Sequence, residues 1–363
     1  MEYGLIGGRL GHSYSKVIHE MLCGYRYDLC PLPTEEEVRA FMTRRQFRAI
    51  NVTIPYKLVV MEYCSYIDPH AKAINAVNTI VNRNGLLYGY NTDYPGFSYL
   101  CDAHGVEFKD RTVLILGTGG THNTTWAVAH DRGAKQIYTV SRHPDPEKGE
   151  LTYAQALTTG AQIIINTTPV GMAPQSGVSP LDLRQFPRCK GVADVIYNPL
   201  RTRLCQQAAE LGIPACGGLL MLAAQAAAAE YAFGTAVPGE ETVLRVYREL
   251  LAERRNLVFI GMPGSGKTTI GRLAAQMLER EFIDCDEEYL LEYGITPEGE
   301  LLAHGELYFR EREEALLRKL SPKTGCVIAA GGGAILREEN VEALRENGLL
   351  CWLRRPLELL PTE

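Results

Sequence analysis

The sequence predicts an α/β protein with parallel sheets, because it twice runs from a short apolar strand through a glycine-rich turn into a helix. The first instance is Thr112–Leu116, followed by Gly117-Thr118-Gly119-Gly120 and a helix from about Asn123. The second is Asn256–Ile260, followed by Gly261–Thr269 and another helix. Short strands alternate with helical stretches around both, which is typical of parallel α/β sheets. We therefore expect two loops able to hold phosphate groups.

Length and composition set the broad class. The 363 residues allow two or three domains. A content of 46% hydrophobic and 22% charged residues is typical of a globular protein, and a net charge of −6 with no long basic run argues against a nucleic-acid surface. No apolar run is long enough to span a membrane, and the start lacks a signal-peptide pattern. Ten scattered cysteines predict reduced thiols and a cytoplasmic location rather than a zinc site.

The segment before residue 98 contains two candidate polar groups at strand ends. Lys57 follows a predicted strand that stops at Pro55, and Asp93 closes another. An amine and a carboxylate that end separate strands can meet and share a proton, whereas the plainer interpretation is an ordinary solvated lysine. The predicted strands are Tyr3–Ile6, Ala49–Ile54, Asn75–Ile80 and Leu87–Asp93, and a helix is predicted over Lys16–Cys23.

The first glycine turn opens a dinucleotide-binding unit. Glycines let the backbone approach a pyrophosphate, and the helix N-terminus then faces that anion. After the next strand, Ile137–Val140, the chain reads Ser141-Arg142-His143. An arginine there suits the 2′-phosphate of NADP, while Asp145 leaves NAD open. The alternatives are a tight turn without a ligand and a solvated surface charge at Arg142.

Further strands are predicted at Gln162–Asn166 and Val192–Ile196, and an alanine-rich helix runs from about Gly217 to Phe233. Ligands collect at the carboxyl ends of strands in open α/β sheets. Gln225 lies within the apolar helix and needs a hydrogen-bond partner if it is buried. A polar-faced helix over Glu241–Arg254 ends the first part of the chain.

The second part begins with G-x-x-x-x-G-K-T, whose backbone N–H groups surround phosphates while Lys267 reaches the β/γ oxygens and Thr268 ligates Mg²⁺. Phe282–Asp286 is predicted as a strand that places Asp284 and Asp286 on one face; the alternatives are surface acids or caps of the next helix. A charged helix opens at Gly305–Arg310. Two more strands are predicted at Cys326–Ala330, before three glycines, and at Leu349–Leu353.

Residues 1–252 resemble the shikimate dehydrogenase family. The resemblance rests on Gly11–Ser15 with His19, Asn51–Lys57, Ala76–Thr79, Gly89–Asp93, Asn166–Met172 and Met221–Gln225. It implies NADPH-dependent reduction of 3-dehydroshikimate, with Lys57 and Asp93 as the catalytic pair. The implied substrate ligands are Ser13, Ser15, Thr53, Asn78, Asp93, Tyr197 and Gln225. The implied NADP ligands are Gly117, Thr118, Gly119, Gly120, Thr121, Ser141, Arg142, His143 and Gly218.

Residues 256–363 resemble shikimate kinase through the phosphate loop, D-x-D, G-E-x-x-F-R and G-G-G segments. The resemblance implies ATP- and Mg²⁺-dependent phosphorylation of shikimate. Shikimate would bind to Asp286, Arg310 and Gly332, and Mg²⁺ to Thr268 and Asp284. ATP would bind to Gly264, Ser265, Gly266, Lys267, Thr268 and Thr269. The resemblance ends before the family's lid arginine and adenine-side loop, so we expect poor or no phosphorylation by these 363 residues.

The expected domains are a substrate domain over 1–98 completed by 217–252, a Rossmann NADP domain over 99–216, and a partial P-loop kinase domain over 256–363. The competing prediction is an NAD-using quinate/shikimate dehydrogenase fused to a non-catalytic nucleotide-binding module. The residues Thr121–Thr124 and Ser141 depart from the family's usual residues, which leaves the strength of the preference for NADP over NAD open. The oligomeric state stays open, with a homodimer as one candidate.

Overall fold

A computed structural model describes residues 1–11, 13–356 and 358, so that His12 of the Gly11–Ser15 motif lies outside the described residues. The chain forms two compact units. The first contains residues 1–169, 180–196 and 207–248, and the second contains residues 170–179, 197–206 and 249–363. Each of the three predicted domain segments contributes one sheet, although the predicted boundaries themselves stay a prediction.

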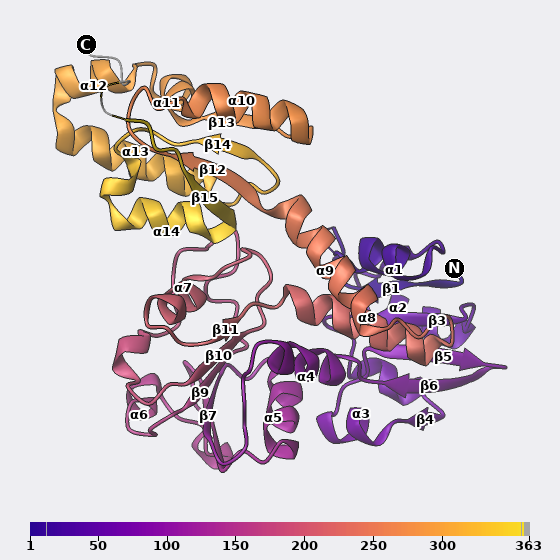
Figure 1. Ribbon diagram of the computed structural model, residues 1–363. Coiled ribbons are helices and arrows are strands. Elements are labelled where there is room, and N and C mark those ends of the chain that lie inside the picture. The colour runs from indigo at the N-terminus through magenta and orange to yellow at the C-terminus, as the bar shows by residue number, and fades with distance from the viewer. Residues whose placement is uncertain (12, 357, 359–363) are drawn as a thin grey trace. The chain divides into compact units, whose positions relative to one another are not determined.

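The first unit begins with a six-stranded mixed sheet (Figure 1). Apolar side chains cover both of its faces, because strand side chains alternate between faces. One face packs against α2 (Glu35–Arg44) and the 3₁₀ turn η1 (Val59–Tyr63), and the other packs against α8 (Leu219–Phe233). Its strands, in spatial order, are β2 (Asp28–Pro31), β1 (Tyr3–Gly7), β3 (Ala49–Val52), β5 (Thr79–Arg83), β6 (Leu86–Tyr90) and β4 (Tyr66–Ile67). The associated helices are α1 (Ser15–Cys23), α2 (Glu35–Arg44), η1 (Val59–Tyr63), α3 (Pro69–Ile74), α4 (Asp93–Ala103) and α8 (Leu219–Phe233). Helix α9 (Glu240–Arg254) begins in this unit and ends in the second.

The second sheet of this unit is parallel throughout its printed pairings and buries the whole apolar run of its central strand. Its order is β11 (Ala215–Cys216), β10 (Gly191–Asp194), β9 (Ile163–Asn166), β7 (Thr112–Leu116) and β8 (Gln136–Val140). From β7 the chain first adds β8 on one side and then β9, β10 and β11 on the other. Ligands collect beside such a change of direction in open α/β sheets. Helices α5 (His122–Asp131), α6 (Tyr153–Ala156) and α7 (Arg203–Glu210) and the turns η2 (Pro146–Lys148) and η3 (Leu183–Gln185) connect these strands.

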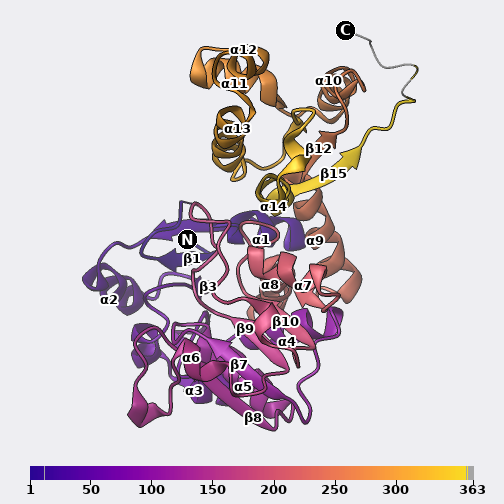
Figure 2. The same cartoon turned by 90° about the vertical axis from the view of Figure 1, so that its left-hand side faces the viewer.

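The second unit is built on a four-stranded parallel sheet with the order β13 (Phe282–Asp284), β14 (Val327–Ala329), β12 (Asn256–Ile260) and β15 (Gly348–Trp352). Helix α10 (Lys267–Leu278) covers one face, and α11 (Cys285–Tyr293) and α13 (Glu306–Leu320) pack on the other (Figure 2). Helices α12 (Pro297–His304) and α14 (Glu338–Asn347) and the turn η4 (Ala334–Leu336) complete it. The phosphate loop therefore lies at the carboxyl end of a central strand.

The predicted fold class is confirmed, and the differences occur at element ends. Asn75 is not in a strand: it caps α3 in the left-handed conformation, and β5 begins only at Thr79. The predicted strand Leu87–Asp93 stops at Tyr90, and Asp93 opens α4. The strand predicted for Phe282–Asp286 stops at Asp284, which caps α11. In each case the predicted strand is too long, because hydrogen bonds that cap the adjacent helix are more favourable than extending the strand.

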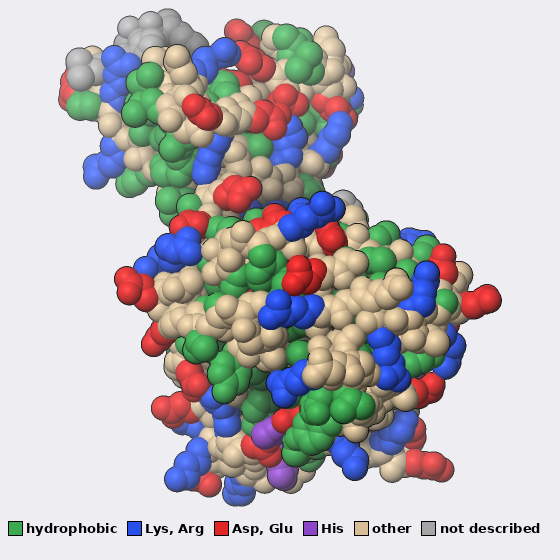
Figure 3. Space-filling model, turned by 90° about the vertical axis from the view of Figure 1, so that its right-hand side faces the viewer, with side chains coloured by type: hydrophobic (Ala, Val, Ile, Leu, Met, Phe, Trp, Pro, Cys, Tyr) green, Lys and Arg blue, Asp and Glu red, His purple; other side chains and the backbone are tan. Residues whose placement is uncertain are grey.

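None of the described helices is both long and apolar enough to cross a membrane. All ten cysteines are free thiols. On the face shown in Figure 3, lysine and arginine side chains are interspersed with acidic ones.

Candidate active site

A lysine–carboxylate pair lies beside the first sheet. Lys57 stands in the turn after β3, and Asp93 is the first residue of α4. Lys57 Nζ donates to Asp93 Oδ2 at 2.5 Å, and the two side chains are 20% and 14% exposed. The pair is therefore close enough to share a proton, yet still open to a small molecule.

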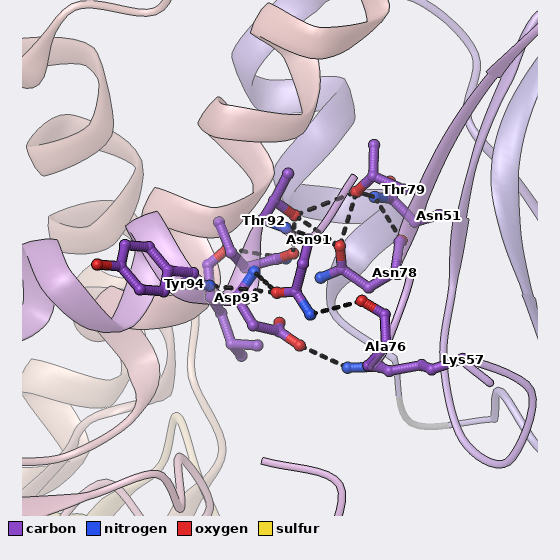
Figure 4. A network of polar contacts seen from close by, with 11 residues as sticks. Asn51, Lys57, Ala76, Asn78, Thr79, Asn91, Thr92, Asp93 and Tyr94 are labelled. Atoms are coloured by element: carbon purple, nitrogen blue, oxygen red, sulfur yellow. Dashed lines mark hydrogen bonds and ion pairs between the residues drawn. The ribbon is translucent and has the colours of Figure 1, made fainter. Parts of the chain in front are cut away.

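A network of amide and hydroxyl groups holds the backbone around this pair (Figure 4). Asn78 Oδ1 accepts hydrogen bonds from the Thr92 N–H at 2.8 Å and from the Thr79 hydroxyl at 3.0 Å. Asn91 Nδ2 donates to the Ala76 carbonyl at 2.9 Å, while its Oδ1 accepts from the Asp93 N–H at 3.1 Å. Because these bonds satisfy the start of α4, the orientation of Asp93 is fixed before any ligand arrives.

Helix α8 brings Gln225 to the same network. The Thr92 hydroxyl contacts Gln225 Oε1 at 3.4 Å. A Cβ added at Gly96 of α4 would lie 2.7 Å from Gln225 Cβ and 3.1 Å from its Cα. Only glycine allows this close approach of two helices, so Gly96 sets how near Gln225 lies to Asp93.

The glycine-rich loop after β7 is open on one side. Gly117 has φ 96°, and a Cβ there would meet Thr168 Cγ2 at 2.8 Å. By contrast, apart from the adjacent residues, none of the described residues places an atom within 4 Å of a Cβ added at Gly119 or Gly120. Thr121, at the N-cap of α5, makes no side-chain capping bond. The His122 N–H, the first of α5, donates to the Gly119 carbonyl at 3.0 Å, and the open side of the Gly119-Gly120 turn leaves room for a ligand beside the N-terminus of α5.

The strand β8 leads to the predicted 2′-phosphate segment. His122 Nε2 contacts Thr139 Oγ1 at 2.8 Å, which ties the start of α5 to β8. Arg142 and His143 are exposed just beyond this strand. The His143 N–H donates to Ser141 Oγ at 3.2 Å, which gives the turn a defined shape.

The phosphate loop of the second unit joins β12 to α10. Lys267 is 9% exposed, and its Nζ donates to the carbonyls of Gly261 at 2.9 Å and Met262 at 3.0 Å. Burial lowers the pKa of Lys267, while the nearby Asp286 and Asp284 act in the opposite direction. Thr268 Oγ1 donates to Asp284 Oδ2 at 2.8 Å. Two hard oxygen donors beside a phosphate loop fit Mg²⁺.

Asp284 and Asp286 do not share a strand face. Asp284 Oδ1 accepts from the Asp286 N–H at 3.0 Å as the cap of α11, and Asp286 lies in the first helical turn. The expected period-two geometry is therefore wrong here, because the strand ends one residue after Ile283 and a helix follows at once.

A charged pocket of about 350 Å³ includes Arg310 in its lining. Arg310 on α13 pairs with Glu313 at 2.8 Å, and both side chains are at most 15% exposed. The Arg310 guanidinium lies against the α-carbon of Gly333, and Gly332 packs on the ring of Pro263 in the phosphate loop. The structure thus gathers Arg310 and the three glycines beside the phosphate loop.

Comparison with known proteins covers both parts of the chain. Residues 5–80 match the shikimate dehydrogenase substrate-binding domain, and residues 263–362 match shikimate kinase. A shikimate dehydrogenase (NADP(+)) from Clostridium perfringens is 33% identical over 266 residues, which are 68% of this chain and 97% of that protein. The chain belongs to the shikimate dehydrogenase family. A Clostridium beijerinckii shikimate dehydrogenase (NADP(+)) is 36% identical over 242 residues, covering 63% of this chain and 90% of that protein.

Solved structures of shikimate dehydrogenases are similar to the same part of the chain. A chorismate mutase/shikimate 5-dehydrogenase fusion protein from Clostridium acetobutylicum matches with TM-score 0.64 and 35% identity, over 68% of this chain and 96% of that one. Shikimate 5-dehydrogenase from Thermus thermophilus, in complex with NADP(H) and shikimate, matches with TM-score 0.61 and 28% identity, over 69% and 99%.

For this shikimate dehydrogenase, the structure brings some of the predicted site residues together. Lys57, Asp93, Asn78 and Gln225 meet through one network. Thr53 directly follows β3, and the Ser15 N–H donates to Ser13 Oγ at 3.3 Å at the start of α1. Gly218 caps the N-terminus of α8, and its N–H donates to the Ile196 carbonyl at 2.8 Å. Tyr197 belongs to the other compact unit, and its role stays a prediction.

Sequence reasoning did not single out Asn51, Thr79, Asn91 and Thr92 as members of the network, nor Glu313 as the partner of Arg310. The signal for the first four was a set of buried polar residues at strand ends, which must find partners. For Glu313 the signal was the i, i+3 spacing from Arg310 on a helix.

Proposed function

We propose that the Lys57–Asp93 pair carries out the proton chemistry of 3-dehydroshikimate reduction. The observation that supports this most directly is the 2.5 Å contact between Lys57 and Asp93 at the edge of a prearranged polar network. Hydride transfer is the chemistry that NADPH supplies when bound. As the carbonyl carbon gains hydride, its oxygen becomes an alkoxide. The Lys57 ammonium stabilises that charge and donates the proton, which leaves the neutral amine and the new hydroxyl.

The remaining candidate residues bind and orient the ring acid. Asp93 keeps Lys57 in place and accepts a hydrogen bond from a substrate hydroxyl. Asn78 and Gln225 offer amide groups from two directions, and their partners already fix them. Ser13, Ser15, Thr53 and Tyr197 complete the proposed set of carboxylate and hydroxyl ligands. This geometry serves a small polyhydroxylated acid, since each polar group can meet one oxygen.

The proposed NADP ligands lie in three segments. The turn Gly117–Thr121 and the N-terminus of α5 offer backbone N–H groups and free space for the pyrophosphate. Ser141, Arg142 and His143 form the proposed 2′-phosphate segment, since a guanidinium forks onto phosphate oxygens. Gly218 contributes close backbone approach.

In the second unit we propose a site for ATP-dependent transfer of a phosphoryl group to a shikimate hydroxyl, and the poor phosphorylation expected from the sequence stays a prediction. Lys267 and the N–H groups of Gly264–Thr269 hold the phosphates, and Thr268 and Asp284 hold Mg²⁺, directly or through water. Asp286, Arg310 and Gly332 bind the ring acid. The free thiols fit the proposed cytoplasmic location.

One assay on the purified chain tests both proposals. NADPH or NADH is supplied with 3-dehydroshikimate or 3-dehydroquinate, with and without ATP and Mg²⁺. We expect preference for NADPH and 3-dehydroshikimate, and this preference would be lost if the chain were an NAD-using quinate enzyme. Lys267→Ala should abolish any phosphoryl transfer and leave NADPH oxidation unchanged, while Lys319→Ala, at an exposed lysine of α13, should alter neither.

A further inference from the structure

A fully buried histidine–glutamate pair joins two helices behind the dehydrogenase site. His19 lies on α1 and Glu230 on α8, and both side chains are 0% exposed. His19 Nδ1 is hydrogen bonded to Glu230 Oε1. Glu230 also accepts hydrogen bonds from the Tyr25 hydroxyl, at 2.5 Å, and from the Thr235 hydroxyl. A buried carboxylate is costly unless it is fully paired, so apolar side chains would join these helices at lower cost.

Contacts continue from this pair to the polar network of the site. The His19 ring stacks on Tyr27, with centroids 4.2 Å apart and planes 4° apart. The buried Tyr27 hydroxyl donates to Asn51 Oδ1 at 2.7 Å. Asn51 Nδ2 in turn donates to Thr79 Oγ1 at 3.0 Å, and Thr79 Oγ1 donates to Asn78 Oδ1. The chain of contacts therefore ends on the residue that also accepts from the Thr92 N–H, next to Asp93.

Both helices of the pair carry proposed substrate ligands. Ser15 is the first residue of α1 and lies on the same face as His19, since residues four apart share a helix face. Gln225 lies on α8, in close contact with Gly96 of α4. A hydrogen bond between the helices fixes their register, whereas an apolar contact tolerates sliding. A small slide of α1 along α8 would move Ser13 and Ser15 relative to Gln225.

We infer that His19 and Glu230 are positioning residues for shikimate binding, an inference that rests on the proposed function. They act by holding the end of α1 that carries Ser13 and Ser15 in register with Gln225. They touch neither the substrate nor the cofactor loop in this scheme. Their loss should therefore weaken shikimate binding in both ground state and transition state, and spare the chemical step.

Steady-state kinetics of shikimate oxidation with NADP⁺ test the inference. We expect His19→Ala and Glu230→Gln to raise KM for shikimate about tenfold or more, since small misplacement of binding groups has effects of that order. The expected change in kcat is less than about threefold, with an unaltered KM for NADP⁺. His19→Asn should restore much of the affinity, because its amide nitrogen can donate to Glu230 from the position of Nδ1.

Phe233→Leu is the matched control. Phe233 lies on α8 and its ring is 6.0 Å from that of His19, but it belongs to the apolar core. It should lower the melting temperature without changing KM for shikimate. The inference is overturned if Phe233→Leu raises KM as much as the polar variants at equal loss of stability, or if His19→Ala and Glu230→Gln fold and keep the wild-type KM. Absence of shikimate oxidation by the wild-type chain would instead overturn the proposed function.

Discussion

The Lys57–Asp93 pair allows a quantitative test by a double-mutant cycle. Lys57→Met keeps the apolar stem but removes the ammonium group that lies 2.5 Å from Asp93. Loss of general acid help typically costs 10²–10⁴-fold in kcat, or about 3–5 kcal/mol of barrier. Asp93→Asn leaves Lys57 in place and removes one charge-assisted hydrogen bond, worth about 1.5–3 kcal/mol, so the expected loss is about tenfold to a hundredfold.

The double variant separates a coupled pair from two independent groups. Because Asp93 acts mainly through Lys57, we expect the double variant to be about as slow as Lys57→Met alone, rather than slower by the product of the two losses. Asp93→Asn should also destabilise the protein by about 0.3–1 kcal/mol, since an acidic residue in the first turn favours α4.

The assay is NADPH oxidation with saturating 3-dehydroshikimate, with Lys72→Met as the control at an exposed lysine of the same domain. NADPH binding, followed by nucleotide fluorescence, should be unchanged in all variants. A Lys57→Met kcat within about threefold of wild type, or losses that multiply in the double variant, would refute this account of the pair.

Three further outcomes are expected. Gly96→Ala places a Cβ 2.7 Å from Gln225 Cβ. Because such overpacking destabilises a protein by about 1–3 kcal/mol, we expect a lower melting temperature and a higher KM for shikimate. An unchanged KM would contradict the role of this close packing in placing Gln225. Arg142→Gln should raise KM for NADPH about tenfold and leave that for NADH unchanged, as loss of one charge-assisted bond predicts; equal effects on both nucleotides would reject Arg142 as the 2′-phosphate ligand. Burial raises the pKa of Glu230, but hydrogen bonds from His19, Thr235 and Tyr25 outweigh it, so the folded pKa lies below the usual value near 4.5. A depressed carboxyl pKa stabilises the fold above the unfolded pKa, and this stabilisation is lost as pH falls through the folded pKa. The difference in melting temperature between wild type and Glu230→Gln should therefore be largest near neutrality and shrink in acid; a constant difference would contradict it.

The sequence predicted the parallel nucleotide-binding units well because their signals are local. Thr112–Leu116 and Asn256–Ile260 are apolar β-branched runs that end at glycine, and both are strands with the predicted bounds. The ends of helices are harder to predict from the sequence. Local sequence predicts Asp93 and Asp284 at strand ends, yet Asp93 opens α4 and Asp284 caps α11, because capping hydrogen bonds are decided by the neighbouring backbone.

Part of the site depends on distant contacts that no local pattern shows. The meeting of Lys57 with Asp93 requires β3 and α4 to converge, and a resemblance to a family, not spacing, indicated it. Glu230 lies in an alanine-rich apolar helix, and its buried partner His19 is 211 positions away in the sequence. Sequence alone identifies such a residue as needing a partner, but the partner emerges only from tertiary packing.

The most direct test of the central claim is the initial rate of NADPH oxidation when 3-dehydroshikimate is added to the purified chain. We expect saturable oxidation, with one shikimate formed for each NADPH consumed and a much lower rate with NADH. No oxidation, or equal rates with NADH and 3-dehydroquinate, would contradict it.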